Sequence, residues 1–178
     1  MELFEFAGLA KPQCSQALTI VEPAIQMAMD EKIVKRPQGF MVVLDPRIQR
    51  EPKYKEPDAK FMKDVVLFTA YFGNPEEWEH PFDDIAVSKA FISWMTGLPA
   101  RLVQYMHPYL YQKGWTKFGG SAVRPGNLIG AFSGVEEHYD EMFAAMMLDA
   151  ITGVCLQEMH GPDGVMAHKN ITYLGDSQ

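Results

Sequence analysis

The fold is decided by residues 116–133, TKFGGSAVRPGNLIGAFS. Two extended stretches, 116–123 and 127–133, flank Arg124-Pro125-Gly126, which has the composition of a tight turn. A turn this short can join only antiparallel strands, because parallel strands need a long crossover connection. The segment therefore predicts a β-hairpin within an antiparallel sheet.

Two further strands are expected upstream of this hairpin. Residues 40–44 (FMVVL) form a continuous apolar run, which is typical of a central strand. Residues 65–72 (VVLFTAYF) are rich in β-branched and aromatic residues. The stretches 47–60 and 74–82 are polar, contain proline and lack periodicity, so they are expected to be long, exposed loops.

The first helix is expected to begin at Thr19-Ile20-Val21-Glu22, which has capping-box spacing. Pro23 would then fall in the first turn, where its missing amide costs little. The sequence KRPQG at 35–39 is expected to end this helix.

A pair of helices is expected between the second strand and the hairpin. Asp83 or Asp84 can cap the first of them, and Gly97 can end it. Pro99 suits the first turn of the second helix, which is expected to end near Gly114.

A last long helix is expected after the hairpin, because Ser133-Gly134-Val135-Glu136 repeats the capping-box spacing. Residues 153–178 lack a clear period and are expected to form a peripheral C-terminal tail. The prediction is one α/β domain of α+β type over 1–178, with a mainly antiparallel sheet flanked by helices.

Composition and charge exclude several function classes. The chain has 178 residues and a net charge of -7, and it has no basic cluster, which argues against general binding to nucleic acid or to acidic membranes. No apolar run approaches the roughly 20 residues of a membrane span, and the first residues are acidic, so a cytoplasmic protein is expected. Cys14 and Cys155 lack metal-site spacing and are expected to be thiols.

Three local motifs resemble a known family. Residues 84–86 (DIA) with 89–91 (KAF) look like its helix motif, and 117–121 (KFGGS) resembles its Phe-Gly-Gly-Gly loop. Residues 128–134 (LIGAFSG) are similar to its closing strand and turn. The family is the GlcG/HbpS-like haem-binding (haem-degrading) family, whose domain is also similar to the C-terminal domain of PduO-type corrinoid adenosyltransferases.

The resemblance implies a profilin-like layered domain that assembles into homo-oligomers, with pockets near the glycine loop and at subunit contacts. It also implies haem or another small molecule as the ligand. The sequence departs from the family pattern at Ser121, where the loop has its third glycine, and at Asp45-Pro46-Arg47, where the family has an Asp-x-x-Gly turn.

Five residues are candidates for ligand binding. Phe118-Gly119-Gly120 can bring backbone amides close to an anion, although adjacent glycines also suit a strained strand entry. The family pattern assigns Lys89 to pairing with an anionic group, against the alternative of a solvated lysine on a helix face. Arg124 in the hairpin turn could steer an acid, although exposed turn arginines usually bind nothing specific.

Haem would need an axial donor, and His107, within the aromatic and Met-rich stretch 105–109, is the candidate. A histidine packed against helix aromatics is the alternative. The other histidines lack ligand spacing, although His138 beside Asp140 could form an acid–base pair. The helical spacing of the methionines, including Met142, Met146 and Met147, favours a core or an interface over a soft-metal site.

These observations predict a homo-oligomeric binding protein for haem or another planar or acidic small molecule, with its pocket near Phe118-Gly119-Gly120. One alternative is an enzyme acting on a small organic acid or aromatic metabolite, with Lys89 or His107 as the acid–base group. Another is an accessory subunit that binds a partner protein through its loops and tail. G-x-S-x-G, P-loop and dinucleotide-binding motifs are missing from the sequence, which argues against those enzyme classes.

Overall fold

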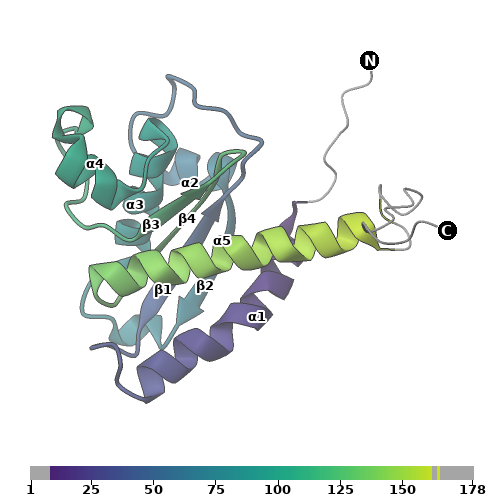
Figure 1. Ribbon diagram of the computed structural model, residues 1–178. Coiled ribbons are helices and arrows are strands. Elements are labelled where there is room, and N and C mark those ends of the chain that lie inside the picture. Colours follow the sequence, from purple (N-terminus) through teal and green to yellow (C-terminus); the bar gives the residue numbers. More distant parts are fainter. Residues whose placement is uncertain (1–8, 162–163, 165–178) are drawn as a thin grey trace.

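The computed structural model describes residues 9–161 and residue 164. A four-stranded antiparallel sheet in the order β2-β1-β4-β3 lies at its centre (Figure 1). The strands are β1 (Gly39–Leu44), β2 (Val66–Phe72), β3 (Ser121–Arg124) and β4 (Leu128–Ser133). Helices flank the sheet on both faces, so the predicted α+β class is confirmed, as is the hairpin that joins β3 to β4.

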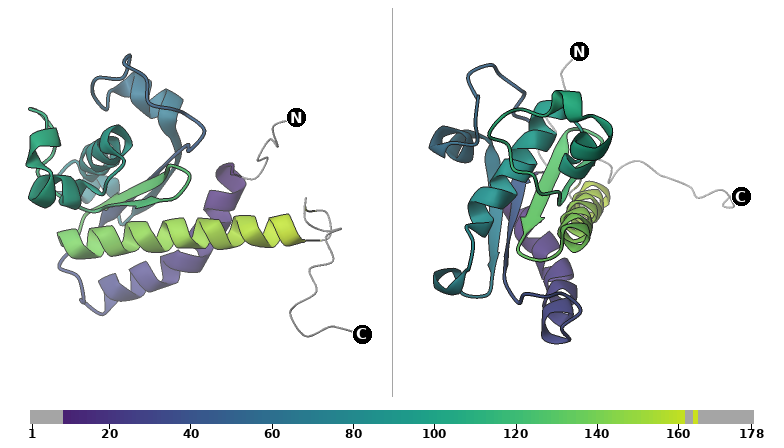
Figure 2. Two further views of the ribbon diagram at one scale, coloured as in Figure 1. Left: turned by 45° about the horizontal axis from the view of Figure 1, so that its top comes forward. Right: turned by 90° about the vertical axis from the view of Figure 1, so that its left-hand side faces the viewer.

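The helices form two layers (Figures 1 and 2). They are α1 (Lys11–Asp30), α2 (Ala59–Val65), α3 (Phe82–Thr96), α4 (Ala100–Met106) and α5 (Glu137–His160), with 3₁₀ turns at Pro75–Glu77 and Pro108–Leu110. Helices α1 and α5 share a core with one face of the sheet, while α2 and α3 share a core with the other. Helix α4 packs on the C-terminal part of α3.

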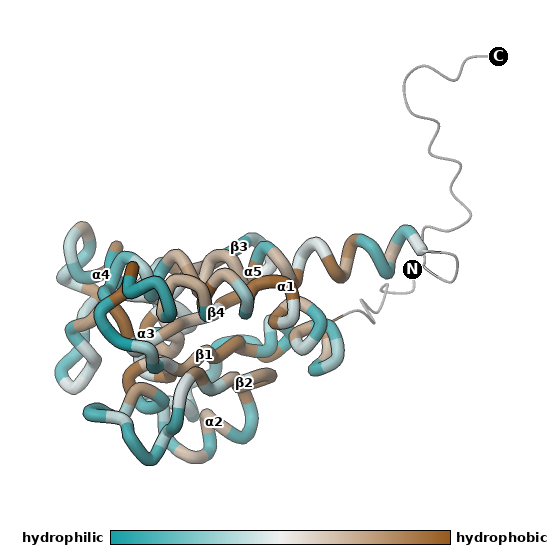
Figure 3. The backbone as a smooth tube through the Cα atoms, turned by 90° about the horizontal axis from the view of Figure 1, so that it is seen from below, coloured by the Kyte–Doolittle hydropathy of each residue, from teal (hydrophilic) through white to brown (hydrophobic). Residues whose placement is uncertain are grey.

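The central strand β1 explains why its sequence is apolar throughout. Met41 and Val43 face the α1 and α5 layer, whereas Phe40, Val42 and Leu44 face α2 and α3. Alternate side chains of a strand point to opposite faces, and both faces of this strand are covered, so all six of its residues are buried. Hydropathy along the chain shows the same arrangement, with an apolar β1 between more polar loops (Figure 3).

The prediction for the start of the first helix is wrong. Helix α1 begins at Lys11, and Thr19 lies inside it, where its hydroxyl donates to the carbonyl of Ser15. The helix starts early because Pro12 suits the first turn and the Gln13 side chain accepts a hydrogen bond from the Ala10 amide. Pro23 is consequently an interior residue of α1.

Helix α1 also ends before the predicted boundary at 35–39, since its last residue is Asp30. Helix α2 was not predicted: it begins at Ala59, inside the loop expected at 47–60, and ends at Val65, the first residue of the expected strand. Asp58 caps it by accepting a hydrogen bond of 2.8 Å from the Phe61 amide. Phe61 and Val65 bury the inner face of this short helix.

The boundaries of α3 and α4 also differ from prediction. Pro81 is the N-cap of α3, so Asp83 and Asp84 lie in the first turn rather than at the cap, while Gly97 ends the helix in a left-handed conformation as expected. Helix α4 ends at Met106 instead of near Gly114, because Pro108 has no amide to continue the helix.

Helix α5 is longer than expected. Its N-cap is Glu136, Ser133 belongs to β4, and the helix runs past Gly153 to His160. The predicted tail therefore begins as helix, and its remaining part lies mostly outside the described residues.

By length and composition, α5 is the one helix among residues 9–161 that could cross a membrane. A core helix of a water-soluble domain passes the same test, and α5 does contribute buried side chains to a core shared with α1 and the sheet, including Phe143, Met147 and Leu148.

Candidate functional site

The glycine loop leads into β3 and lies against a buried ion pair. Gly120 has a φ of +116°, which favours glycine, and its carbonyl accepts from the Phe132 amide of β4. A Cβ atom at Gly120 would lie 2.5 Å from the Cβ of Asp140 and 3.0 Å from the Nζ of Lys89. The second loop glycine is therefore required both by its conformation and by the closeness of α3 and α5.

Lys89 and Asp140 form this ion pair, with 2.7 Å between Nζ and Oδ2. Lys89 also donates to the Phe132 carbonyl at 3.0 Å, and Asp140 accepts from the Val135 amide at 3.1 Å. Burial raises the pKa of Asp140 to about 6, although the Lys89 ammonium opposes this shift. Burial also lowers the pKa of Lys89, against the attraction of Asp140.

Lys89 is 1 % exposed, so the alternative of a solvated lysine on a helix face is wrong. Its ammonium points into the interior and is already held by a carboxylate and a carbonyl oxygen. Lys89 packs against Gly120 of the glycine loop and lines neither of the two hollows described below.

The first loop glycine binds a carboxylate of the protein itself. The Gly119 amide donates a short hydrogen bond to a carboxylate oxygen of Glu137, in the first turn of α5. Arg101 of α4 packs close to Gly119 and makes a two-pronged ion pair with Glu141, at 2.7 and 3.0 Å. Glu141 raises the pKa of Arg101 through these hydrogen bonds.

A hollow of about 330 Å³ lies beside this group. Its lining consists of Pro99, Arg101, Leu102, Tyr105 and Glu141. The side of α4 thus offers an exposed aromatic ring and an aliphatic side chain next to a guanidinium. We call this region the loop hollow, and Gly119 packs against the Cβ of Arg101 in its wall.

A second hollow of about 460 Å³ is almost entirely apolar. Leu128 of β4 and Ile151, Leu156 and Met159 of α5 contribute to its walls. Cys155 also lines this apolar hollow, and burial raises the pKa of its thiol. Neither Cys14 nor Cys155 forms a disulfide, as the sequence predicts.

Phe118 and Arg124, the other predicted ligand-binding residues, do not line the loop hollow. Phe118 is 47 % exposed at the surface of the loop, with the Lys117 ammonium over its ring. Arg124 forms an ion pair with Asp149 of α5, at 2.6 Å, on the surface beside the hairpin. Arg124 does not line the loop hollow.

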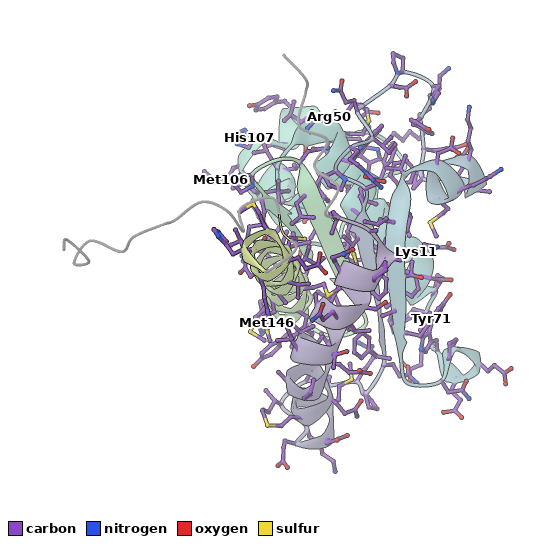
Figure 4. All side chains as sticks on the ribbon, turned by 90° about the vertical axis from the view of Figure 1, so that its right-hand side faces the viewer. Lys11, Arg50, Tyr71, Met106, His107 and Met146 are labelled. Carbon is purple, nitrogen blue, oxygen red and sulfur yellow. The ribbon has the colours of Figure 1, made fainter. Side chains whose placement is uncertain are left out.

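His107 caps the C-terminus of α4 and does not line either hollow. Its Nδ1 atom lies 2.8 Å from the hydroxyl of Tyr109, and the two rings are in edge-to-face contact. This arrangement matches a histidine packed against aromatic neighbours. Figure 4 shows His107 beside Met106 at one edge of the molecule.

The remaining histidines and methionines do not form a metal centre in the described part of the chain, where no group of three or more His, Cys, Asp or Glu side chains gathers. His138 is exposed and packs against the ring of Tyr139, and His168 lies outside the described residues. Met147 is buried in the core and Met142 is partly exposed on α5, consistent with a core or an interface.

Sequence reasoning missed Arg101, Glu137 and Glu141. A signal for them was present, because Glu137 and Glu141 are four residues apart and so share one face of α5. The position of Arg101 depends on how α4 folds back over α3 and reaches the glycine loop, which no local pattern encodes. Comparison of the chain with protein-family models, curated proteins and solved structures finds no match.

Proposed function

We propose that this protein binds a small planar carboxylic acid in the loop hollow. One observation carries the proposal: the Arg101 guanidinium lines the hollow and holds a carboxylate. The neighbouring Gly119, which packs against the Cβ of Arg101, holds a second carboxylate with its amide. The residues that supply these carboxylates, Glu137 and Glu141, come from one turn of α5. The same two donors can hold an acid supplied by a ligand.

The walls of the hollow favour a flat, partly apolar molecule. Tyr105 is 71 % exposed and Leu102 is 39 % exposed, although both line a concavity. An aromatic ring of a ligand can lie against these side chains while its carboxylate reaches Arg101. An aliphatic acid without a ring would contact Arg101 through its carboxylate but would not pack against Tyr105 and Leu102.

The Arg101–Glu141 ion pair sets the affinity of the loop hollow for a carboxylate ligand. A ligand carboxylate must displace Glu141 from Arg101, so the Glu141 carboxylate competes with it. Removal of that competitor is expected to tighten binding, whereas removal of Arg101 is expected to abolish most of it. This opposite response of two residues in one pair distinguishes binding in the loop hollow from general effects on stability.

The test is calorimetric titration with benzoate and phenylacetate, and with acetate as the ligand without a ring. Arg101→Gln is expected to weaken binding by about 10- to 100-fold, since a charge-assisted hydrogen bond contributes about 1.5–3 kcal/mol. Glu141→Gln is expected to strengthen it, and Arg124→Gln, which breaks the separate pair with Asp149, should leave it unchanged. Unaltered affinity in Arg101→Gln, or a lack of saturable binding, would overturn the proposal.

Haem is the second candidate ligand, and the apolar hollow fits it better than the loop hollow does. The lining of the loop hollow offers Tyr105 as its one axial donor and contains no histidine, cysteine or methionine. The apolar hollow contains Met159 and Cys155, which are both haem donors, and Arg47 at its edge. Since the raised pKa of Cys155 keeps its thiol protonated, Met159 is the better donor of the two.

An absorbance titration with hemin tests this second candidate. A Soret change that weakens in Met159→Leu and persists in His107→Ala would favour haem in the apolar hollow. A change lost only in His107→Ala would move the site to the end of α4. The absence of any saturable change would remove haem as a ligand and leave the carboxylic acid.

An acid–base role for Lys89 gains no support from its surroundings. Its ammonium is sealed beneath the glycine loop, where Asp140 and Phe132 occupy it. A substrate in either hollow would not reach it without movement of the loop. The binding function therefore remains the better interpretation of this part of the molecule.

A further inference from the structure

The apolar surface around the loop hollow extends beyond the hollow itself. Half of the large apolar side chains that are exposed in the described part of the chain lie within residues 102–118. Of these, Leu102 and Tyr105 line the hollow, whereas Met106 and Phe118 do not, although they are 65 % and 47 % exposed. Met106 follows Leu102 by one turn of α4, so the two share one side of the helix. A molecule that filled the hollow alone would leave much of this surface in water.

The segment that precedes the glycine loop runs alongside α4. The Gln104 side chain donates to the Thr116 carbonyl at 3.4 Å, and Gly119 packs against the Cβ of Arg101, about one turn earlier in α4. The residues between these two contacts are 117 and 118. Phe118 is therefore next to the wall of the loop hollow, although its side chain does not line it.

Lys117 adds a positive charge at the same edge of the hollow. It is exposed, and its ammonium lies 5.6 Å from the centroid of the Phe118 ring. The surrounding sequence supplies no carboxylate for it, because residues 85–135 contain no Asp or Glu. Within the described part of the chain, Lys117 makes no ion pair. Its charge is thus available to an acidic ligand that reaches past the hollow.

The size of the hollow limits what can enter it. Its volume of about 330 Å³ lies near the lower end of the range for ligand pockets, so it suits a single aromatic residue better than a folded segment. Arg101 lines the same hollow as Tyr105 and Leu102, so a ring and a carboxylate must lie close together in the ligand. The last residue of a polypeptide has this arrangement when its side chain is aromatic.

We propose that the acid held in the loop hollow is the C-terminal carboxylate of another protein, whose last residue is aromatic and whose preceding residues are acidic. The inference rests on the proposed function, because the same Arg101 contact holds the carboxylate. The last ring packs against Tyr105 and Leu102, the preceding backbone passes over Phe118, and the acidic side chains lie near Lys117. Capture of a terminal carboxylate is a recurring mode of peptide recognition.

The test is calorimetric titration of the full chain with three probes at about 50 mM NaCl. They are N-acetylphenylalanine, the tetrapeptide acetyl-EDEF with a free carboxylate, and the same tetrapeptide with a C-terminal amide. The free-acid tetrapeptide is expected to bind about 10-fold more tightly than N-acetylphenylalanine, because it adds contacts with Lys117 and Phe118. The amide is expected to bind at least about 10-fold more weakly than the acid, because it has no charge to pair with Arg101.

Variants at Lys117 separate the polypeptide from the free acid. Lys117→Gln is expected to lower the affinity for the free-acid tetrapeptide by about 2- to 5-fold, as for an exposed ion pair, and to leave the affinity for N-acetylphenylalanine unchanged. Lys117→Arg keeps the charge and should bind both as the native protein does. Lys63→Gln, which removes one exposed positive charge from α2, is the matched control and should change neither affinity.

The outcomes separate this inference from the proposed function. If benzoate and N-acetylphenylalanine bind but the tetrapeptide binds no more tightly, or its amide binds as well as the acid, the polypeptide ligand is overturned and the proposed function stands. An advantage of the tetrapeptide that persists in Lys117→Gln would also overturn the inference, because the acidic residues would then lie elsewhere. If none of the acids binds, the inference and the proposed function fail together.

Discussion

The Lys89 ammonium and the Asp140 carboxylate lie 2.7 Å apart in the interior, and their contact joins α3 to α5. Their side chains are only 1 % and 4 % exposed, and both make a further hydrogen bond to the backbone. Gly120 passes directly over the pair. The pair therefore holds Gly120 at a fixed position relative to α3 and α5. The position of Gly120 in turn orients the neighbouring Gly119 amide toward Glu137.

Loss of Lys89 should destabilise the protein strongly. Lys89→Met leaves the Asp140 carboxylate buried without its counter-ion, so the free energy of unfolding is expected to fall by about 3–5 kcal/mol in urea titrations at pH 7. The double variant Lys89→Met/Asp140→Leu buries no charge, so it is expected to be more stable than Lys89→Met alone. A double variant that is less stable than Lys89→Met would contradict a direct pair.

The pair should also give stability an unusual pH dependence. The pKa of Asp140 is about 6 in the folded state against an ordinary value of 3.8, so the folded protein binds this proton more tightly than the unfolded chain. The contribution of Asp140 to stability therefore rises as the pH falls from about 7 to about 4, by an amount on the order of 3 kcal/mol. The ion-paired Asp45 and Asp149, whose pKa values are lowered, act in the opposite direction.

Urea midpoints measured from pH 7 to pH 4 separate these effects. The stability of the native protein minus that of Lys89→Met/Asp140→Leu cancels the contributions of Asp45 and Asp149, which both proteins share. This difference should become more favourable to the native protein on acidification. A flat or falling difference would show that Asp140 has no raised pKa in the folded state.

The sheet was predictable from the sequence because its strands have strong local patterns. The run FMVVL at 40–44 is apolar at every position, and the turn at Arg124-Pro125-Gly126 permits only a hairpin. The helix boundaries were less predictable, because competing start patterns occur in the chain. Thr19 and Glu22 have capping-box spacing, yet the helix begins eight residues earlier, where Gln13 and Pro12 suit a first turn.

The candidate site was only partly predictable. The sequence pointed to the glycine loop and to Lys89, and these residues do lie together. It did not show that Asp140 neutralises Lys89 or that Arg101 reaches the loop, since these contacts join residues 51 and 18 positions apart. Such pairings depend on how α3, α4 and α5 pack, and a single sequence contains no local signal for that packing.

Ser121, which stands where the loop of the family that the sequence resembles has its third glycine, holds the start of α4. Its hydroxyl oxygen accepts from the Ala100 amide at the start of α4, at 2.8 Å, and contacts the Ser93 hydroxyl at 2.8 Å. Ser121→Ala or Ser121→Gly would leave the buried Ala100 amide unsatisfied, at a cost of about 1–3 kcal/mol. Thermal unfolding should show this loss, whereas Ser133→Ala, at a buried serine with no side-chain hydrogen bond in the described structure, should cost less.

Alanine substitution at Gly120 tests how tightly its neighbours pack around it, and the same substitution at Gly153 is the matched control. Gly120→Ala requires a φ of +116° and places a methyl group 2.5 Å from the Cβ of Asp140, so it is expected to cost at least about 2 kcal/mol and to weaken carboxylate binding at the loop hollow. Gly153 lies inside α5 with open space around it, so Gly153→Ala should instead stabilise the protein by about 0.5–1 kcal/mol. Chemical unfolding of both variants measures the contrast. Equal effects would mean that the loop moves away from α3 and α5 freely, and that the Lys89–Asp140 pair does not hold it in place.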